Sequence, residues 1–358
     1  MNIKKYFTCF YFVAGMYHAH AQTHAINYKP CIDTLYQNIY HHFYDTTAKL
    51  FFEEYSAGKK QTHSYLWPLC ALIQAANEAE QINPDENYIS PVVNAIDQYY
   101  TDALPTPAYQ ASVTKEKKDD CFYDDNQWIA IAYLDIYNRR HEKRFLNVAK
   151  QIYDFMMTGY DTAAGGGLYW KYNDKTTKNT CSNGPGILVA LQLYKITNNK
   201  KYLNTALQLY NWVNAHLQSP DLLYYDNIKV PSLKIDSAKY TYNTGTMLQS
   251  NVLLYNITHK KEYLQKAEAI ADAAENFFYK DGKLPGNYWF NAVMLRGFIE
   301  LYKVDNNKQA LAFFYNDAER TWKNERDSQN LLGRNANKKT LIDQAAMLEI
   351  YARLQKIK

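Results

Sequence analysis

Several patterns that assign a protein to a common class are missing from this 358-residue sequence. It holds no run of roughly 20 apolar residues, which a membrane-spanning helix needs, so we expect no stable membrane insertion. Its 40 basic and 36 acidic residues form no basic tail, which gives no indication of a nucleic-acid partner. Its cysteines and histidines lack metal-ligand spacing, so we predict neither a metal nor another cofactor.

Strand patterns are also nearly absent. Almost every segment instead repeats apolar residues at three- and four-residue steps, which is typical of helices that face a core. Counting these segments predicts twelve helices. They span residues 33–55, 64–80, 87–100, 124–139, 142–159, 183–197, 200–217, 244–257, 260–279, 289–303, 307–324 and 340–356.

An internal repeat marks the turns between the predicted helices. Leu193–Ala206 matches Leu254–Ala267, a weaker copy covers 136–149, and a degenerate copy begins at Leu301. Each copy holds the end of one helix, a short polar turn and the start of the next, which is a helical hairpin. Six hairpins predict an all-α fold closed into an (α/α)6 barrel. An open solenoid is the alternative, although it would normally need polar capping repeats.

The N-terminus has the organisation of a secretory signal peptide. Two lysines precede an apolar and aromatic stretch at 6–16, and Ala-His-Ala at 19–21 offers small residues for cleavage. We therefore expect residues 1–21 to be a signal peptide. The protein should be exported, to the periplasm or beyond, after cleavage near Ala21. Residues 22–358 are expected to form a single domain.

Four cysteines remain after this cleavage, and an exported protein permits disulfides between them. Four thiols allow three pairings, and the spacing does not choose among them. We expect free or partly paired structural cysteines. They are Cys31, Cys70, Cys121 and Cys181.

Two adjacent acids, Asp124 and Asp125, stand at the start of a predicted helix whose apolar face begins at Trp128. The positive end of the helix dipole favours anions there, and a helix cap would account for one of the two acids. Two neighbouring carboxylates between Tyr123 and Trp128 repel each other, which separates their pKa values. Such separation suits one acid to donate a proton while the other stays ionised.

Four loops that precede predicted inner helices carry aromatic and amide residues. They are 101–123, 159–182, 218–243 and 280–290. Taken singly, each composition is that of ordinary turns and caps. In a closed barrel all four would reach the rim that holds the acid pair. Together they favour an aromatic-lined cleft that binds sugars.

These motifs resemble those of glycoside hydrolase family 76, the bacterial and fungal α-1,6-mannanases. The matching segments are Tyr123-Asp124-Asp125-Asn126-Gln127-Trp128, Gly165–Trp170, Ser182–Pro185, Tyr242–Gly245 and Asp343–Ala346. The resemblance implies an (α/α)6 barrel and retaining hydrolysis of α-1,6-mannosidic bonds. It implies that Asp124 is the nucleophile and Asp125 the general acid and base. The partner would be an α-mannan polysaccharide or oligosaccharide, and we expect a monomer.

Rim position and the family resemblance together predict eight substrate-binding residues. They are Tyr123, Trp128, Tyr169, Trp170, Asn183, Tyr242, Asn243 and Arg296. The chain departs from the family at Tyr169, where a second tryptophan is common. It departs again at Asn291-Ala292, where the family has a Lys-Gly pair.

Other functions remain open at this stage. Another carbohydrate-active enzyme of the same fold is one alternative, but an epimerase would want paired histidines and a uronate lyase a basic cleft. A glycan-binding relative without catalysis is another, and the presence of both acids argues against it.

The spacing of Asp124 and Asp125 bears on the stereochemistry of the reaction. Consecutive Cα atoms lie about 3.8 Å apart, which places the two carboxyl groups roughly 5–6 Å apart. That spacing favours a retaining mechanism.

Overall fold

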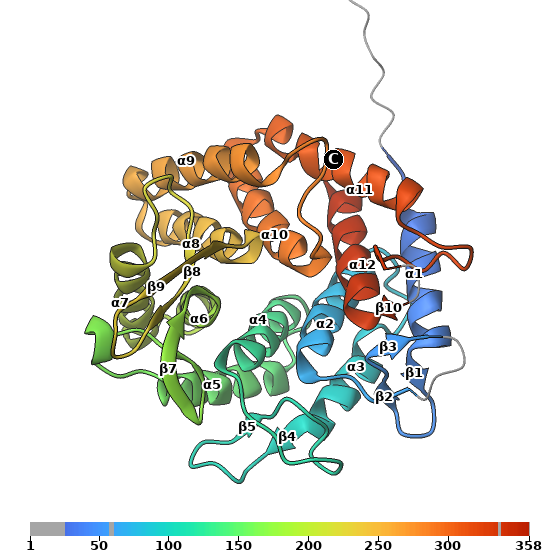
Figure 1. Ribbon diagram of the computed structural model, residues 1–358, viewed down its shortest axis with the longest axis horizontal. Helices are drawn as coiled ribbons and strands as arrows, with labels where there is room; N and C mark the ends of the chain where they lie inside the picture. Colours follow the sequence, from blue (N-terminus) through green and yellow to red (C-terminus); the bar gives the residue numbers. More distant parts are fainter. Residues whose placement is uncertain (1–25, 57–60, 336–337, 358) are drawn as a thin grey trace, which may run out of the picture.

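The computed structural model describes residues 26–56, 61–335 and 338–357, and these residues form two concentric rings of helices (Figure 1). Each inner helix contacts the next, and the last contacts the first, which closes the ring. The inner helices are α2 (Leu66–Glu80), α4 (Tyr123–Arg140), α6 (Thr180–Thr197), α8 (Thr241–Thr258), α10 (Tyr288–Asp305) and α12 (Leu341–Lys356). The (α/α)6 barrel predicted from the repeat is confirmed.

The outer ring pairs one helix with each inner helix. Five pairs are consecutive in the chain, whereas the sixth joins its two ends, because α1 packs against α12. The outer helices are α1 (Lys29–His42), α3 (Ile89–Ile96), α5 (Lys143–Met157), α7 (Lys200–His216), α9 (Lys261–Phe278) and α11 (Ala312–Asn324). This closure excludes the open solenoid.

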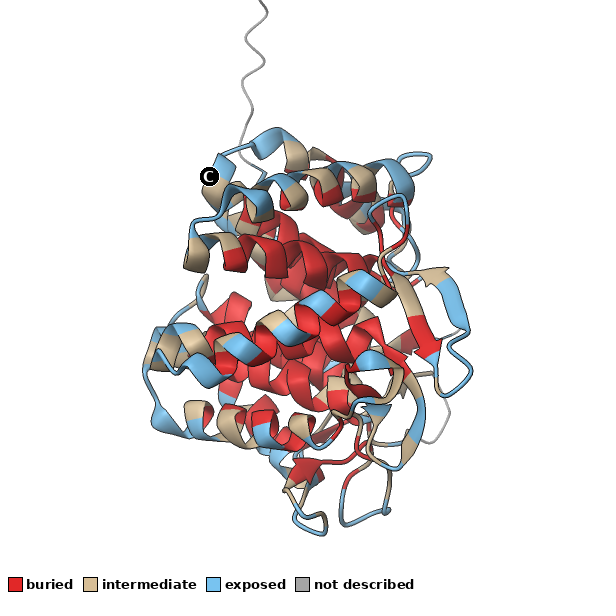
Figure 2. Ribbon diagram, turned by 90° about the vertical axis from the view of Figure 1, so that its left-hand side faces the viewer, coloured by how far each residue is buried: buried red, intermediate tan, exposed pale blue. Residues whose placement is uncertain are grey.

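The two rings differ in burial, as Figure 2 shows. Every residue of α6 from Thr180 to Leu193 is buried, and so is every residue of α8 from Thr241 to Leu254. Outer helices such as α5 bury one stripe and leave the rest half-buried or exposed. A helix surrounded by others must be apolar or hydrogen-bonded on all sides, so polar residues inside the inner ring need an explanation.

The repeat corresponds to a common way of ending four inner helices. The residue after each helix is left-handed, and its N–H donates to the carbonyl of a tyrosine four residues earlier, which is a standard helix stop. The four pairs are His141 with Tyr137, Asn198 with Tyr194, His259 with Tyr255 and Asn306 with Tyr302. The degenerate fourth copy therefore has the same function as the other three.

The first predicted helix, 33–55, is too long at its C-terminal end. It ends at His42, and the chain then forms β1 (Tyr44–Asp45), β2 (Leu50–Phe51) and β3 (Glu54–Tyr55). The Asp45 Oδ1 atom accepts from the backbone of Thr47 at 2.8 Å and of Ala48 at 3.0 Å. That side-chain turn competes with the helix and turns the chain back.

The expected near-absence of strands is wrong for the rim. Two loops far apart in sequence build a four-stranded antiparallel sheet in the order β6-β7-β8-β9, with Thr177 opposite Lys229. Its strands are β6 (Tyr169–Lys171), β7 (Asp174–Asn179), β8 (Tyr225–Lys229) and β9 (Ile235–Lys239). The remaining strands are β4 (Tyr100–Thr101), β5 (Ala108–Tyr109) and β10 (Lys339–Thr340). Since β7 ends where α6 begins, the sheet stands over the N-terminal ends of the inner helices.

In the described part of the chain all four predicted structural cysteines are free, and three of them are buried.

Residues 1–21, assigned above to a signal peptide, lie outside the described residues. Among the described helices, none combines the length and the apolar character needed to cross a membrane.

Candidate functional site

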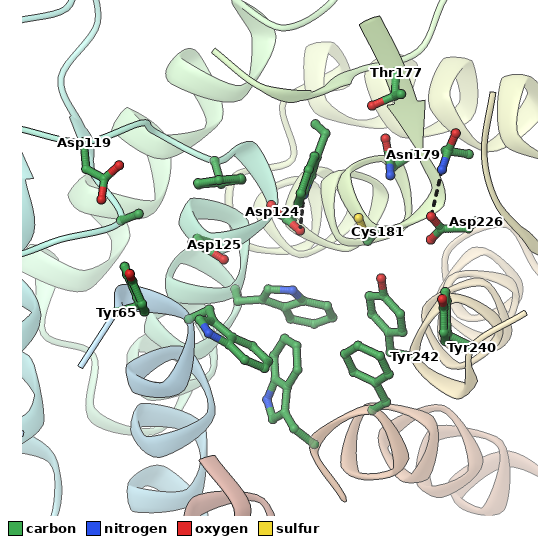
Figure 3. A pocket seen from close by; sticks show the side chains of 18 of the residues that line it. Tyr65, Asp119, Asp124, Asp125, Thr177, Asn179, Cys181, Asp226, Tyr240 and Tyr242 are labelled. Carbon is green, nitrogen blue, oxygen red and sulfur yellow. Dashed lines mark hydrogen bonds between the residues drawn. The ribbon is translucent and has the colours of Figure 1, made fainter. Parts of the chain in front are cut away.

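A cavity of about 740 Å³ opens at the N-terminal ends of the inner helices, under the rim sheet (Figure 3). Asp124 and Asp125 lie at its centre. The other lining residues are Tyr65, Trp67, Ala111, Lys117, Asp119, Phe122, Trp128, Trp170, Thr177, Asn179, Cys181, Asp226, Asn227, Tyr240, Tyr242, Trp289 and Phe290.

Buried amides attach the rim loops to the barrel. In three inner helices the fourth residue is an amide that accepts from the backbone N–H of one loop residue and donates to the carbonyl of the same residue. The pairs are Asn126 with Tyr109, Asn183 with Leu168 and Gln344 with Leu332. The donor–acceptor distances run from 2.7 to 3.0 Å. These amides satisfy loop backbone groups that would otherwise be buried without partners.

The loop that carries Trp170 is fixed by a buried lysine. Residues 164–167 all have positive φ, and a side chain on Gly167 would approach Trp212 to 2.7 Å, so glycine is required there. The Lys178 ammonium, which is fully buried, donates to Asp161 and to the carbonyls of residues 161, 163 and 166. The next strand, β6, then presents Trp170 to the cavity.

The two acids have different surroundings. The indole Nε1 of Trp170 donates to Asp124 Oδ2 at 3.2 Å, and burial raises the pKa of Asp124 to about 6. The Trp170 indole and the Cys181 thiol beside it stabilise the ionised form and limit that rise. Burial and the negative charge of Asp124 raise the pKa of Asp125 well above its usual range. Over an intermediate pH range the pair therefore holds one proton, and Asp125 is its favoured site.

One wall of the cavity is aromatic. Trp289 packs edge-to-face against both Trp67 and Trp128, with centroid distances of 5.8 and 5.3 Å. Tyr242 stacks on Phe290 at 3.9 Å. Flat apolar surfaces of this kind suit the apolar faces of sugar rings.

The opposite wall is polar and belongs to the rim sheet. Asp226 on β8 accepts from Asn227 at 2.8 Å and from Asn243 at 3.4 Å, while burial raises its pKa. Asn179 and Thr177 from β7 lie beside it. A carboxylate and amides can bind several sugar hydroxyls, so the cavity offers stacking on one side and hydrogen bonds on the other.

The sequence model of glycosyl hydrolase family 76 matches residues 28–354, which is most of the chain. The chain belongs to glycosyl hydrolase family 76. The relationship suggested by the motifs around Asp124 and Asp125 is therefore confirmed at the level of the family.

Individual relatives are distant. The mannan endo-1,6-alpha-mannosidase DCW1 of Saccharomyces cerevisiae is 27% identical over 172 residues, which cover 44% of this chain and 38% of that protein. The chain thus spans less than half the length of this curated relative. A family 76 glycoside hydrolase from a bovine Bacteroides thetaiotaomicron strain is 28% identical, with a TM-score of 0.83 over 91% of this chain and 77% of that one. An inactive α-1,6-mannanase variant from Salegentibacter was solved with α-1,6-mannotriose. It is 22% identical, with a TM-score of 0.79, and the match covers 92% of this chain and 100% of that one.

Three of the eight predicted substrate-binding residues line the cavity of this family 76 protein. They are Trp128, Trp170 and Tyr242, which come from three separate segments and surround the acid pair. Their contact with substrate remains a prediction.

Tyr123 and Tyr169, which were also predicted to bind substrate, do not line the cavity. The Tyr123 hydroxyl meets Thr158 at 3.1 Å and its ring packs on Phe155, so it belongs to the core. The Tyr169 hydroxyl donates to Asp161 at 2.9 Å. Tyr169 is thereby attached to the loop that Lys178 holds in place. Strand alternation explains the second case, because Trp170 and Tyr169 must point to opposite faces.

Asn183, Asn243 and Arg296 are also absent from the cavity lining. Asn183 is the loop amide described above, and Asn243 is buried behind Asp226. Arg296 lies below the floor, paired with Glu349, and lines a separate cavity of about 620 Å³ near the other ends of the inner helices. The structure gives each of the three a structural partner, and their contact with substrate remains a prediction.

Sequence reasoning missed several lining residues that share one position. The second residue of five inner helices lines the cavity, and only in α4 had it been singled out as catalytic. The five are Trp67, Asp124, Cys181, Tyr242 and Trp289. The predicted starts of these five helices differ from the observed ones by one to three residues, so the shared position became visible only in the structure. Asp226 had no such signal, since it lies on a strand that was not predicted.

Proposed function

We propose that this protein hydrolyses α-1,6-mannosidic bonds of α-mannan with retention of configuration. The observation that supports this most directly is the difference between the adjacent acids in the cavity. Asp124 has hydrogen-bond donors that favour its charged form, whereas the pKa of Asp125 is raised further by burial and by Asp124. Unequal carboxyls are what a nucleophile and a proton donor need.

In the proposed first step, the Asp124 carboxylate forms a bond to the anomeric carbon of the mannose. The glycosidic bond to the O6 oxygen of the next sugar breaks, and Asp125 gives its proton to that oxygen. In the second step, ionised Asp125 takes a proton from a water molecule whose oxygen attacks the anomeric carbon. Asp124 is then released as a carboxylate, and the two displacements together retain the configuration.

The shape of the cavity favours cleavage within a chain. Tyr65 lies toward one side of the acid pair and Tyr240 toward the other in Figure 3. Both line the cavity, and they are 51% and 40% exposed. Sugar units could stack on either side of the reacting bond, so we propose endo action.

The relatives support the same substrate class without assigning it. The yeast relative is named a mannan endo-1,6-alpha-mannosidase, but the match covers 38% of its length. The Salegentibacter structure holds α-1,6-mannotriose, and its low identity limits the likeness to the fold. The roles of Asp124 and Asp125 therefore rest on their geometry.

The test is incubation of the purified protein with unbranched α-1,6-mannan, followed by proton NMR and separation of products by length. We expect mixed oligosaccharides, with the α anomer of the new reducing end appearing before mutarotation. Release of mannose alone would indicate exo rather than endo action. Appearance of the β anomer first would contradict the nucleophile role of Asp124. Binding without turnover would favour the glycan-binding alternative, and turnover only of other glycans would favour a different enzyme of this fold.

A prediction for Trp170 separates its two contacts. The ring is 38% exposed in the cavity, and its N–H donates to Asp124. Trp170→Ala should raise the Kd for α-1,6-mannotriose about 5- to 10-fold, since a ring contact contributes about 1 kcal/mol. Trp170→Phe should keep most of that affinity. It should also move the acid limb of kcat/KM to higher pH, because loss of the donor raises the pKa of Asp124.

Isothermal titration and pH–rate profiles of the two Trp170 variants provide the measurements. Unchanged affinity in Trp170→Ala would leave the residue a packing role only. An unmoved acid limb in Trp170→Phe would mean that the indole N–H does not stabilise ionised Asp124.

We also propose that the protein is exported and acts as a monomer, with residues 22–358 as its catalytic domain. The basis for export is the pattern of residues 1–21. Expression in a secreting host should give a mature protein that begins at Gln22. N-terminal sequencing that finds Met1 intact on exported protein would contradict the cleavage site.

A further inference from the structure

A chain of buried charges lies beneath the floor of the cavity. Arg296 on α10 and Glu349 on α12 form a bidentate pair in which both nitrogen–oxygen distances are 2.7 Å. Their side chains are 5% and 0% exposed. Glu349 also accepts from Arg353 at 2.7 Å, and the chain continues to Glu78, which pairs with Arg353 and Lys356.

The upper end of this chain meets the aromatic wall. The guanidinium carbon of Arg296 is 5.4 Å from the centroid of the Trp128 ring. Trp128 also lines the cavity and packs edge-to-face on Trp289. A guanidinium held by two hydrogen bonds presents a fixed plane, and a cation beside an indole is attracted to it. Glu349 thereby holds the Arg296 guanidinium, which lies against the Trp128 ring.

Stability alone does not explain this pair. Burying two charges costs so much solvation that well-packed apolar residues of the same volume often give equal or greater stability. What the ion pair adds is a defined geometry at a place where the ring that it contacts also lines the cavity.

We propose that Arg296 and Glu349 are positioning residues that hold the Trp128 indole in the orientation required for sugar stacking. The orientation of the ring does not depend on which ligand binds. The consequence for mannan affinity rests on the function proposed above.

Two matched substitutions test the proposal. Glu349→Gln and Glu78→Gln each neutralise a buried glutamate that pairs with two cations of the same chain, but only Glu349 contacts Arg296. The first readout needs no ligand. It is the fluorine resonance of 5-fluorotryptophan at Trp128, assigned by Trp128→Phe. The second readout is the Kd for α-1,6-mannotriose, measured in the Asp124→Asn background. The third is a comparison of the changes in KM and in kcat, measured with Asp124 intact.

We expect Glu349→Gln to shift the Trp128 resonance and to raise Kd and KM roughly 5- to 10-fold, with a smaller change in kcat. Glu78→Gln should leave the resonance in place and Kd within about 2-fold. Equal changes in the two variants, or an unmoved resonance in Glu349→Gln, would overturn the proposal. If the resonance moves only in Glu349→Gln but no variant binds mannotriose, the positioning stands and the mannan substrate is wrong.

A double variant keeps the test decisive if the single variants fold poorly. Arg296→Met with Glu349→Leu removes both charges, so no buried charge of the pair is left alone at this position. We expect its unfolding free energy to approach that of the parent while the Trp128 resonance stays shifted and mannotriose affinity stays low. Parent-like affinity in a stable double variant would contradict the proposal.

Discussion

Substituting either acid of the pair should nearly abolish turnover. Asp124→Ala is expected to lower kcat by about 10⁴-fold or more, because the proposed covalent intermediate forms on this carboxylate. Asp125→Ala should lower it roughly 10²- to 10⁴-fold, which is the usual contribution of a general acid and base. Initial rates on α-1,6-mannan, with circular dichroism to establish folding, measure both effects.

Azide distinguishes the two roles. With an activated aryl α-mannoside, azide can enter the space left in Asp124→Ala and attack from the β face, giving the β-mannosyl azide. In Asp125→Ala the covalent intermediate still forms, and azide should open it to the α-mannosyl azide. The reverse assignment of products would exchange the roles of the two acids. An absence of rescue in both, with normal folding, would argue against a covalent mechanism.

The same residues should destabilise the fold at neutral pH. Burial raises the pKa of both carboxyls, so the folded state binds protons more tightly than the unfolded chain. Stability is therefore lost as pH rises from about 4 through 6. Asp124→Asn should gain on the order of 1–3 kcal/mol at about pH 7 and almost nothing near pH 3.5. A gain that does not depend on pH would show that the carboxyls are not strained by burial.

Asn183→Ala should cost about 2–4 kcal/mol of unfolding free energy, the second large effect expected. The amide is fully buried, and it bonds both backbone groups of Leu168 and the carbonyl of Asn179. Its loss leaves several buried polar groups without partners, each of which costs about 1–3 kcal/mol. Urea denaturation of the parent and the variant measures the difference.

A surface amide provides the control for Asn183. Asn199 caps α7 by accepting from the backbone of Lys201 at 3.0 Å, and it is exposed. Asn199→Ala should cost only about 1 kcal/mol. If Asn183→Ala proves no more costly than this control but weakens sugar binding, the earlier interpretation of Asn183 as a direct ligand would be right.

Local sequence was sufficient for much of this fold. The apolar period of residues 124–139 predicted α4 to within one residue at each end, because a helix depends on residues three and four positions apart. The repeated tyrosine and the left-handed residue four positions later mark helix ends for the same reason. The position of Asp124 and Asp125 in a first helical turn followed from these local signals.

Only the tertiary structure decided which polar residues face the cavity. Asn183 and Asn126 occupy the same place in two helices and hold loop backbones, which no local pattern distinguishes from ligand contact. Asp226 reaches the cavity because β8 pairs with β7, whose residues lie about fifty positions earlier. Arg296 turns below the floor because Glu349, on another helix, is there to bind it. Side-chain direction depends on partners distant in sequence, and those partners are brought together only when the barrel closes.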